Sequence, residues 1–173
     1  MHITVLYVII PVVMKTCAFT GNRPDKLPWG YDETDSRCLS ASEQILGEIF
    51  RAAEEGFGRF VCGMAQGGDT MFAEAVLFAK KTHNIILECA VPFKNQCAHW
   101  NELSVRRYNK IIASADEVNV LSDKYTPWCM HARNRYMVDR ADRIIALNYA
   151  DSGGTKYTLE YALRKNKEII CLV

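Results

Sequence analysis

Three glycine-bearing turns carry the residue types in this sequence that are best suited to binding an anion. Each follows a short apolar run, and they are Thr20-Gly21-Asn22-Arg23-Pro24, Gly63–Asp69 and Asp151–Thr155. Glycine lets the backbone approach a ligand closely and turn its N–H groups toward negative charge. A helix that begins behind such a turn adds the positive end of its dipole. The pattern predicts a pocket for a phosphate-bearing small molecule.

Side chains in and beside these turns extend the candidate site. Asp69 either caps the helix that follows it or accepts hydrogen bonds from ribose hydroxyls. Arg133 either grips phosphate with its planar fork or belongs to a solvated basic helix face. Thr155 is either the N-cap of the last helix or part of a second phosphate cradle. The candidate ligand-binding residues are Thr20, Gly21, Asn22, Arg23, Gly63, Met64, Ala65, Gly67, Gly68, Asp69, Arg133, Asn134, Asp151, Gly153, Gly154 and Thr155.

Two further motifs contain metal-ligating or aromatic side chains. Cys97-Ala98-His99 and Cys129-Met130-His131 together offer four zinc ligands, but their spacing matches no familiar zinc module, so we expect no metal site. Trp100 and Trp128 flank these segments. Each of the two tryptophans either stacks on a base or packs as a partly buried aromatic.

Alternating strand and helix patterns position these residues. Strands are expected over Thr16–Thr20, Arg59–Cys62, Ile85–Val91, Glu117–Leu121, Arg143–Leu147 and Glu168–Leu172. Helices are expected over Leu39–Glu55, Thr70–Lys81, Leu103–Ser114, Met130–Asp139 and Tyr157–Lys165. This alternation predicts an α/β fold: a single Rossmann-like, open, mostly parallel sheet with helices on both faces. Ligands bind at the carboxyl ends of the strands in such sheets.

Two segments fall outside this regular pattern. Residues 22–38 form a long polar loop after the first strand, and a loop of that length is expected to act as a lid over the site. The apolar run Leu6–Val13 is too short to span a bilayer, which needs about 20 residues. We therefore expect residues 1–14 to be an N-terminal extension or an extra strand, and residues 15–173 to form the domain.

Composition narrows the class of protein. The formal net charge is +1, from 21 basic and 20 acidic residues, which argues against a dedicated nucleic-acid surface. A local basic rim around Arg133, Arg135, Arg140 and Arg143 is the alternative. The seven cysteines form no C-x-x-C motif and lie mostly in apolar runs. This usage predicts a protein of the reducing cytoplasm. The short apolar run Leu6–Val13 gives no reason to expect membrane association.

Together the motifs resemble the SLOG superfamily, and most closely its YpsA-like branch. The matching segments are Phe19–Pro24, Gly63–Asp69, Pro92-Phe93, Arg107-Tyr108, Tyr125 with Cys129, Arg133–Asp139 and Ser152–Thr155. The chain departs from the branch at Asn22, where a histidine is expected. The resemblance implies a Rossmann-like domain that binds a nucleotide or nucleotide-derived ligand, and it is compatible with a homodimer or a protein partner.

Two related families imply sharper alternatives. The LOG-type phosphoribohydrolases carry a motif similar to Met130–Met137, with Asn134 here in place of a lysine, and a Gly-Gly motif similar to Ser152-Gly153-Gly154. In an enzyme of that kind, Arg133 and Glu160 would be catalytic and would cleave the N-glycosidic bond of a nucleoside 5′-monophosphate. If Gly154-Thr155 is aligned with the family's Gly-Thr instead, the glutamate position falls on Thr158. The DprA family, which binds single-stranded DNA, has a segment similar to Arg133-Asn134-Arg135.

The sequence thus predicts a sensor or regulator that binds a nucleotide-derived small molecule. Candidate ligands are NAD, ADP-ribose and nucleoside phosphates, and no cofactor is required. Hydrolysis of a nucleotide and DprA-like DNA binding are the two alternatives, with DNA disfavoured by the near-neutral charge.

Overall fold

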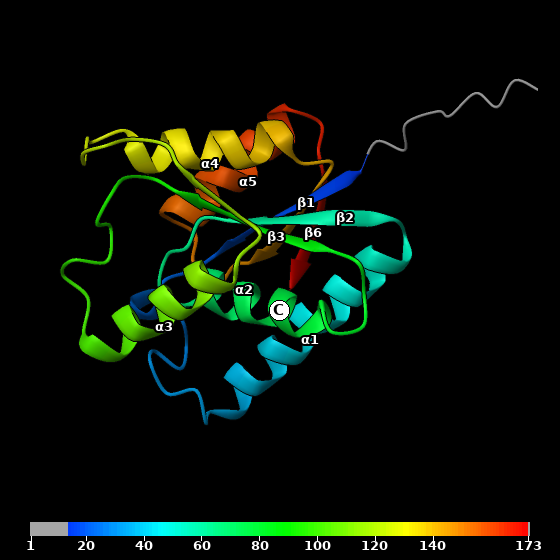
Figure 1. Cartoon of the computed structure of the whole chain (residues 1–173), viewed down its shortest axis with the longest axis horizontal. Helices are drawn as coiled ribbons and strands as arrows, with labels where there is room; N and C mark the ends of the chain where they lie inside the picture. Colours follow the sequence, from blue (N-terminus) through cyan, green and yellow to red (C-terminus); the bar gives the residue numbers. More distant parts are fainter. Residues whose placement is uncertain (1–13, 173) are drawn as a thin grey trace, which may run out of the picture.

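A six-stranded sheet lies between two layers of helices (Figure 1). The computed structural model describes residues 14–172. The strands are β1 (Lys15–Gly21), β2 (Phe57–Cys62), β3 (Ile86–Val91), β4 (Glu117–Val120), β5 (Arg143–Leu147) and β6 (Glu168–Leu172). The helices are the 3-10 turn η1 (Pro24–Lys26), α1 (Ser36–Glu54), α2 (Gly68–Ala79), α3 (Glu102–Ser114), α4 (Cys129–Arg140) and α5 (Gly154–Arg164). The α/β class expected from the sequence is confirmed.

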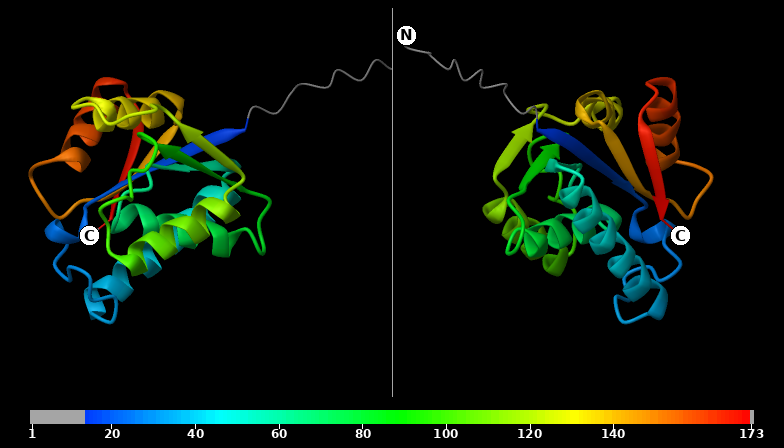
Figure 2. Two further views of the ribbon diagram at one scale, coloured as in Figure 1. Left: turned by 60° about the vertical axis from the view of Figure 1, so that its left-hand side comes forward. Right: turned by 90° about the vertical axis from the view of Figure 1, so that its right-hand side faces the viewer.

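All neighbouring strands are parallel, in the order β4-β3-β2-β1-β5-β6. The chain builds outward from β1 to β4 with α1, α2 and α3 on one face. It then returns to the other side of β1, where α4 and α5 cover the opposite face (Figures 1 and 2). The strand order therefore reverses between β1 and β5. In open α/β sheets, ligands bind in the crevice at such a reversal.

The two faces of the sheet are packed differently because successive strand residues point to opposite sides. Phe19 stacks on Phe72 of α2 with ring centroids 4.5 Å apart, under the three-helix layer. On the other face, the small side chains of Ala18 and Ala90 pack with Val138 of α4. Small residues let α4 lie close to the sheet, which fixes the position of the side chains at its N-terminal end.

The segment after β1 is shorter and better packed than the sequence predicts. Helix α1 begins at Ser36, three residues before the expected start, because the Asp35 side chain accepts a hydrogen bond from the Arg37 N–H. Within the remaining loop, Leu27 and Trp29 are buried, and Trp29 meets Tyr149 edge to face. This loop, residues 22–35, is therefore anchored beside the segment that follows β5.

Arginines that are close in sequence are separated in the fold. Arg143 lies at the start of β5, at the opposite end of this strand from the carboxyl ends that face the pocket, and pairs with Glu55 and Glu168. Arg140 is at the end of α4, and its Nε lies 3.8 Å from Oε1 of Glu88. The basic rim considered above is therefore not formed by these residues.

The described residues also bear on what the sequence indicates about membrane spans, metal ligands, cysteines and the N-terminal segment. Within residues 14–172, no helix is long and apolar enough to cross a bilayer, and no group of acidic, histidine and cysteine side chains is arranged to hold a metal ion. All seven cysteines are free thiols. Apart from Met14, the expected N-terminal extension lies outside the described residues.

Candidate functional site

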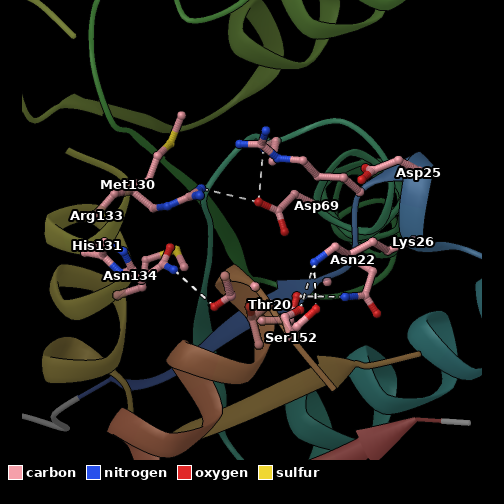
Figure 3. A pocket seen from close by; sticks show the side chains of 17 residues that line it. Thr20, Asn22, Asp25, Lys26, Asp69, Met130, His131, Arg133, Asn134 and Ser152 are labelled. Atoms are coloured by element: carbon pink, nitrogen blue, oxygen red, sulfur yellow. Dashed lines mark hydrogen bonds and ion pairs between the residues drawn. The ribbon is translucent and has the colours of Figure 1, made fainter. Parts of the chain in front are cut away.

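A pocket of about 440 Å³ opens at the strand reversal, above the carboxyl ends of β1 and β5 (Figure 3). Its volume is within the range of small-molecule sites. It is lined by Thr20, Gly21, Asn22, Arg23, Asp25, Lys26, Ala65, Asp69, Met130, His131, Arg133, Asn134, Met137, Ser152, Gly153, Gly154 and Thr155. All three glycine-bearing turns contribute to this lining, as does α4 from Met130 to Met137.

Six residues that the sequence placed in the site do not line the pocket: Gly63, Met64, Gly67, Gly68, Asp151 and Glu160. Met64 is fully buried in the core, with a φ of +57°. Asp151 and Glu160 are exposed. The structure therefore does not bring Glu160 to Arg133, while Thr158, the other position considered for the glutamate, is buried and donates to the Gly154 carbonyl.

Gly63 makes room for an arginine. A Cβ at this position would lie 1.3 Å from Nη1 of Arg133 and 2.2 Å from its Cζ, so the guanidinium occupies the space that any side chain at residue 63 would take. The guanidinium is buried against the end of β2 in this way. Gly63 thus acts on the pocket through Arg133.

Gly21 and Gly68 allow the first and second turns to touch. A Cβ on Gly21 would be 2.9 Å from the Gly68 Cα, and a Cβ on Gly68 would be equally close to the Gly21 Cα. Gly67, with a φ of +86°, is the N-cap of α2, the place proposed for Asp69 as a cap. Gly67 and Gly68 therefore serve close backbone packing against the first turn.

Asn22 joins the first and third turns. Its side-chain N–H₂ donates to the Thr155 hydroxyl at 3.3 Å, and its side-chain oxygen accepts from the Tyr149 N–H at 2.5 Å. Its backbone carbonyl accepts from the Gly68 N–H at 3.1 Å. Because asparagine both donates and accepts, this single side chain fixes the relative positions of the loops around the pocket.

Arg133 and Asp69 form a buried charged pair in the pocket wall, 6% and 4% exposed respectively. Arg133 Nη1 lies 3.4 Å from Asp69 Oδ2, which also accepts from the Ala65 N–H at 3.1 Å. Burial lowers the pKa of Arg133, and the negative charge of Asp69 opposes this shift. Among the described residues, Arg133 Nε is buried without a hydrogen-bond partner. The pair therefore retains unused hydrogen-bonding capacity on its cationic side.

The N-terminus of α5 faces the same pocket. Gly153 is its N-cap, with a φ of +96°, which replaces the expected cap at Thr155. The N–H groups of a first helical turn have no acceptor inside the helix. Lys26 Nζ lies next to this turn and donates to the Ser152 carbonyl at 3.0 Å, while Asn134 donates to the Gly154 carbonyl at 3.3 Å. The arrangement suits an oxyanion.

The buried position of Asp69 predicts a pH effect. Desolvation raises the pKa of Asp69 above 3.8, although the charge of Arg133 and the Ala65 N–H oppose the shift. The native state then holds the Asp69 proton more tightly than the unfolded chain does. The free energy of unfolding should therefore fall as the pH rises from 3.8 through the native pKa, and this component should be missing in Asp69→Asn.

Two measurements check this prediction. A carboxyl ¹³C titration by NMR should place the Asp69 midpoint above 3.8, and urea unfolding of wild type and Asp69→Asn should show stability curves that diverge over that window. A midpoint at or below 3.8 would contradict it.

Six lining residues were not among the candidates drawn from the sequence: Asp25, Lys26, Met130, His131, Met137 and Ser152. Lys26 and Asp25 belong to η1, within the segment expected to be a lid, so the lid hypothesis was the available signal. Met130 and Met137 lie on α4 three residues before and four residues after Arg133, on the same helix face, and His131 stands at the same spacing from Asn134. Figure 3 shows the α4 side chains facing Lys26 across the pocket.

Comparison with known proteins gives the same family from sequence. The model of a family described as the YspA SLOG family matches residues 17–170. A UPF0398 protein of Halalkalibacterium halodurans is 30% identical over 160 residues, which is 90% of this chain and 84% of the relative. The SPbeta prophage-derived protein YoqJ of Bacillus subtilis is 35% identical over 142 residues, covering 73% of this chain and 78% of the relative.

Solved structures share the fold at low identity. DNA processing protein A (DprA) from Streptococcus pneumoniae has a TM-score of 0.63 at 15% identity; the match covers 91% of this chain and 50% of that protein. DprA from Helicobacter pylori, described by its single-stranded DNA binding mode, has a TM-score of 0.63 at 15% identity, and the match covers 92% of this chain and 65% of that protein. The protein TM1055 has a TM-score of 0.58 at 12% identity, and the match covers 90% of this chain and 72% of that protein. This chain thus spans about half of the first DprA structure.

Proposed function

Because this chain belongs to the YspA SLOG family, we propose that it binds a nucleotide or nucleotide-derived small molecule and acts as a sensor or regulatory module. The observation that carries the proposal is the buried Arg133, whose guanidinium faces the pocket and is paired with Asp69 through one long contact of 3.4 Å. A buried cation with spare donors is favourable when an anion completes its hydrogen bonds.

The distribution of charge in the pocket matches a phosphorylated sugar. In this proposal the phosphate lies at the N-terminus of α5, beside Lys26 and the N–H groups of the first turn, which have no acceptor inside the helix. Asp69 offers carboxylate oxygens to ribose hydroxyls, and Arg133 holds Asp69 and offers its remaining N–H donors to oxygen atoms of the ligand.

The geometry favours binding over the hydrolytic alternative. Glu160, which would act with Arg133 in LOG-like cleavage, is exposed on α5 and lies outside the pocket lining. The formal net charge of +1 disfavours DNA binding of the DprA kind, which relies on a basic surface. DNA binding is included in the test below.

A thermal-shift panel tests the proposed function. The ligands are NAD, ADP-ribose, nucleoside mono-, di- and triphosphates, and a short single-stranded oligonucleotide. A ligand at about 100 times its Kd adds about 2.7 kcal/mol to native stability, equivalent to a rise in melting temperature of roughly 5–10 °C. We expect such a rise with a nucleotide. An unchanged melting temperature with every ligand at millimolar concentration would contradict the proposal. A rise with the oligonucleotide alone would favour DNA binding in its place.

The phosphate position is tested by Lys26→Met, with Lys110→Met on the exposed face of α3 as the matched control. Loss of one charge-assisted hydrogen bond should weaken the binding of the nucleotide that raised the melting temperature by roughly tenfold or more, measured by calorimetry. The control should bind like wild type. Equal affinities in all three proteins would remove Lys26 from the phosphate site.

A further inference from the structure

An aromatic cluster stands at the α4 side of the pocket. His131, in the first turn of α4, lines the pocket and meets the Tyr157 ring edge to face, with centroids 4.2 Å apart. Trp128 precedes it, at 6.3 Å from the His131 ring and tilted by 43°. The cluster of Trp128, His131 and Tyr157 therefore joins the pocket wall to the molecular surface.

Trp128 differs from the other two tryptophans of the chain in its surroundings. Trp29 is buried and packs on Tyr149, and Trp100 is half-buried and meets Tyr108 edge to face at 5.5 Å. Trp128 is 72% exposed. A large aromatic surface thus remains open to solvent directly beside a residue that lines the pocket, and this exposure carries a hydrophobic cost that a stacked ligand would relieve.

The pocket is chemically asymmetric. Figure 3 shows Lys26 on one side of the pocket and Met130 and His131 on the other, with Asp69 between them and Ser152 below. A thioether and an imidazole ring form a polarisable wall of the kind that an aromatic ring contacts favourably. A phosphate on the first side and a ribose at Asp69 would direct the third part of a nucleotide, its base, toward the second side.

We propose that Trp128 and His131 form a stacking surface for the aromatic base of the ligand. The ligand class is then a nucleoside phosphate, as opposed to a sugar phosphate without a base. This inference rests on the proposed function, because it places the base relative to the phosphate site. Tyr157 holds the His131 ring in position through their edge-to-face contact and has no direct role with the ligand.

The experiment compares ligands with and without a base on the full chain. Calorimetry measures the affinities of AMP, GMP, CMP, UMP and ribose 5-phosphate for wild type, Trp128→Ala, Trp128→Phe and Tyr125→Ala. Tyr125 is the matched control, since it precedes α4 on the same loop and is 64% exposed. Stacking on an aromatic side chain should make the best nucleotide bind roughly tenfold or more tightly than ribose 5-phosphate in wild type.

The variants show whether Trp128 supplies that difference. Trp128→Ala should weaken the best nucleotide roughly tenfold and leave ribose 5-phosphate within about twofold, while Trp128→Phe should recover part of the loss. Tyr125→Ala should match wild type. Unchanged nucleotide affinity in Trp128→Ala, or an equal loss for both ligand types, would overturn the stacking surface.

The outcomes also separate this inference from the proposed function. If wild type binds ribose 5-phosphate as tightly as every nucleotide, the base-stacking surface is wrong and the phosphate site stands. If wild type binds none of the five ligands and no nucleotide of the thermal-shift panel, the nucleotide function fails and the stacking surface falls with it.

Discussion

Replacing Gly21 with alanine is expected to lower the free energy of unfolding by about 3 kcal/mol, at the upper end of the usual cost of overpacking. The new Cβ would lie 2.7 Å from Cε1 of Phe19 and 2.9 Å from the Gly68 Cα. Phe19 is stacked on Phe72 in the core, and the Gly68 Cα is backbone at the start of α2. Neither neighbour can move away without disturbing the sheet or the pocket.

Gly47→Ala is the matched control for this prediction. Gly47 lies inside α1, and a Cβ there would meet nothing within 4 Å. Alanine in a helix interior is favoured over glycine by roughly 0.5–1 kcal/mol, so this variant should be more stable than wild type. Urea unfolding of the three proteins measures both effects. If the two variants change stability in the same direction, the close contact between Gly21 and Gly68 is not a determinant of the fold.

Replacing Arg133 with alanine is expected to weaken ligand binding by about 30-fold or more. Truncating one partner of a buried, hydrogen-bonded charge pair costs about 2–5 kcal/mol in binding. The variant also leaves the Asp69 carboxylate buried without its cation, so the pKa of Asp69 should rise further and the protein should be less stable at neutral pH. Calorimetry with the nucleotide found in the panel measures the affinity.

Arg135→Ala removes the same charge from the same helix at an exposed position two residues away. It should bind ligand within about twofold of wild type, since exposed charges contribute little. Arg133→Lys separates charge from geometry: lysine keeps the positive charge but loses the planar fork, and an intermediate affinity is expected. If Arg133→Ala and Arg135→Ala lose affinity equally, the effect belongs to net charge, and the buried site is wrong. Circular dichroism confirms that each variant is folded before its affinity is compared.

Local patterns were sufficient to predict the fold. Each buried strand is a short apolar run, and each helix follows a turn, so the order of elements and the sheet edge that gathers the turns could be derived from the sequence. Arg133, Asp69 and Gly153 were placed at that edge by this reasoning, and all three lie at the strand reversal. Whether they bind the predicted ligand remains a prediction.

The roles of individual glycines could not be derived, because they depend on contacts distant in sequence. Gly63 was proposed to approach a ligand, yet its missing side chain is the space taken by Arg133, seventy residues later. Gly68 was assigned to a cradle, and it packs on Gly21. A glycine in the sequence indicates only that another group approaches the backbone closely at that position. The identity of that neighbour is a property of the tertiary structure.

The start of α1 was predicted three residues late for a different reason. The apolar stripe that marks the helix begins at Leu39, but Asp35 sets the boundary through its hydrogen bond to the Arg37 N–H. Capping precedes the first buried residue of a helix, so an apolar pattern alone places the start too late.

The strand order has a consequence for the order in which the chain becomes complete during synthesis. β1 pairs with β2 on one edge, but its other edge pairs with β5, where Gly21 is in register with Leu147. A ribosome releases β1 long before β5 and α5, so one edge of the central strand waits unpaired until most of the chain has emerged. Nascent chains at this stage expose an edge that favours aggregation, and the ligand proposed for the pocket cannot protect them, since the last wall of the pocket has not been made.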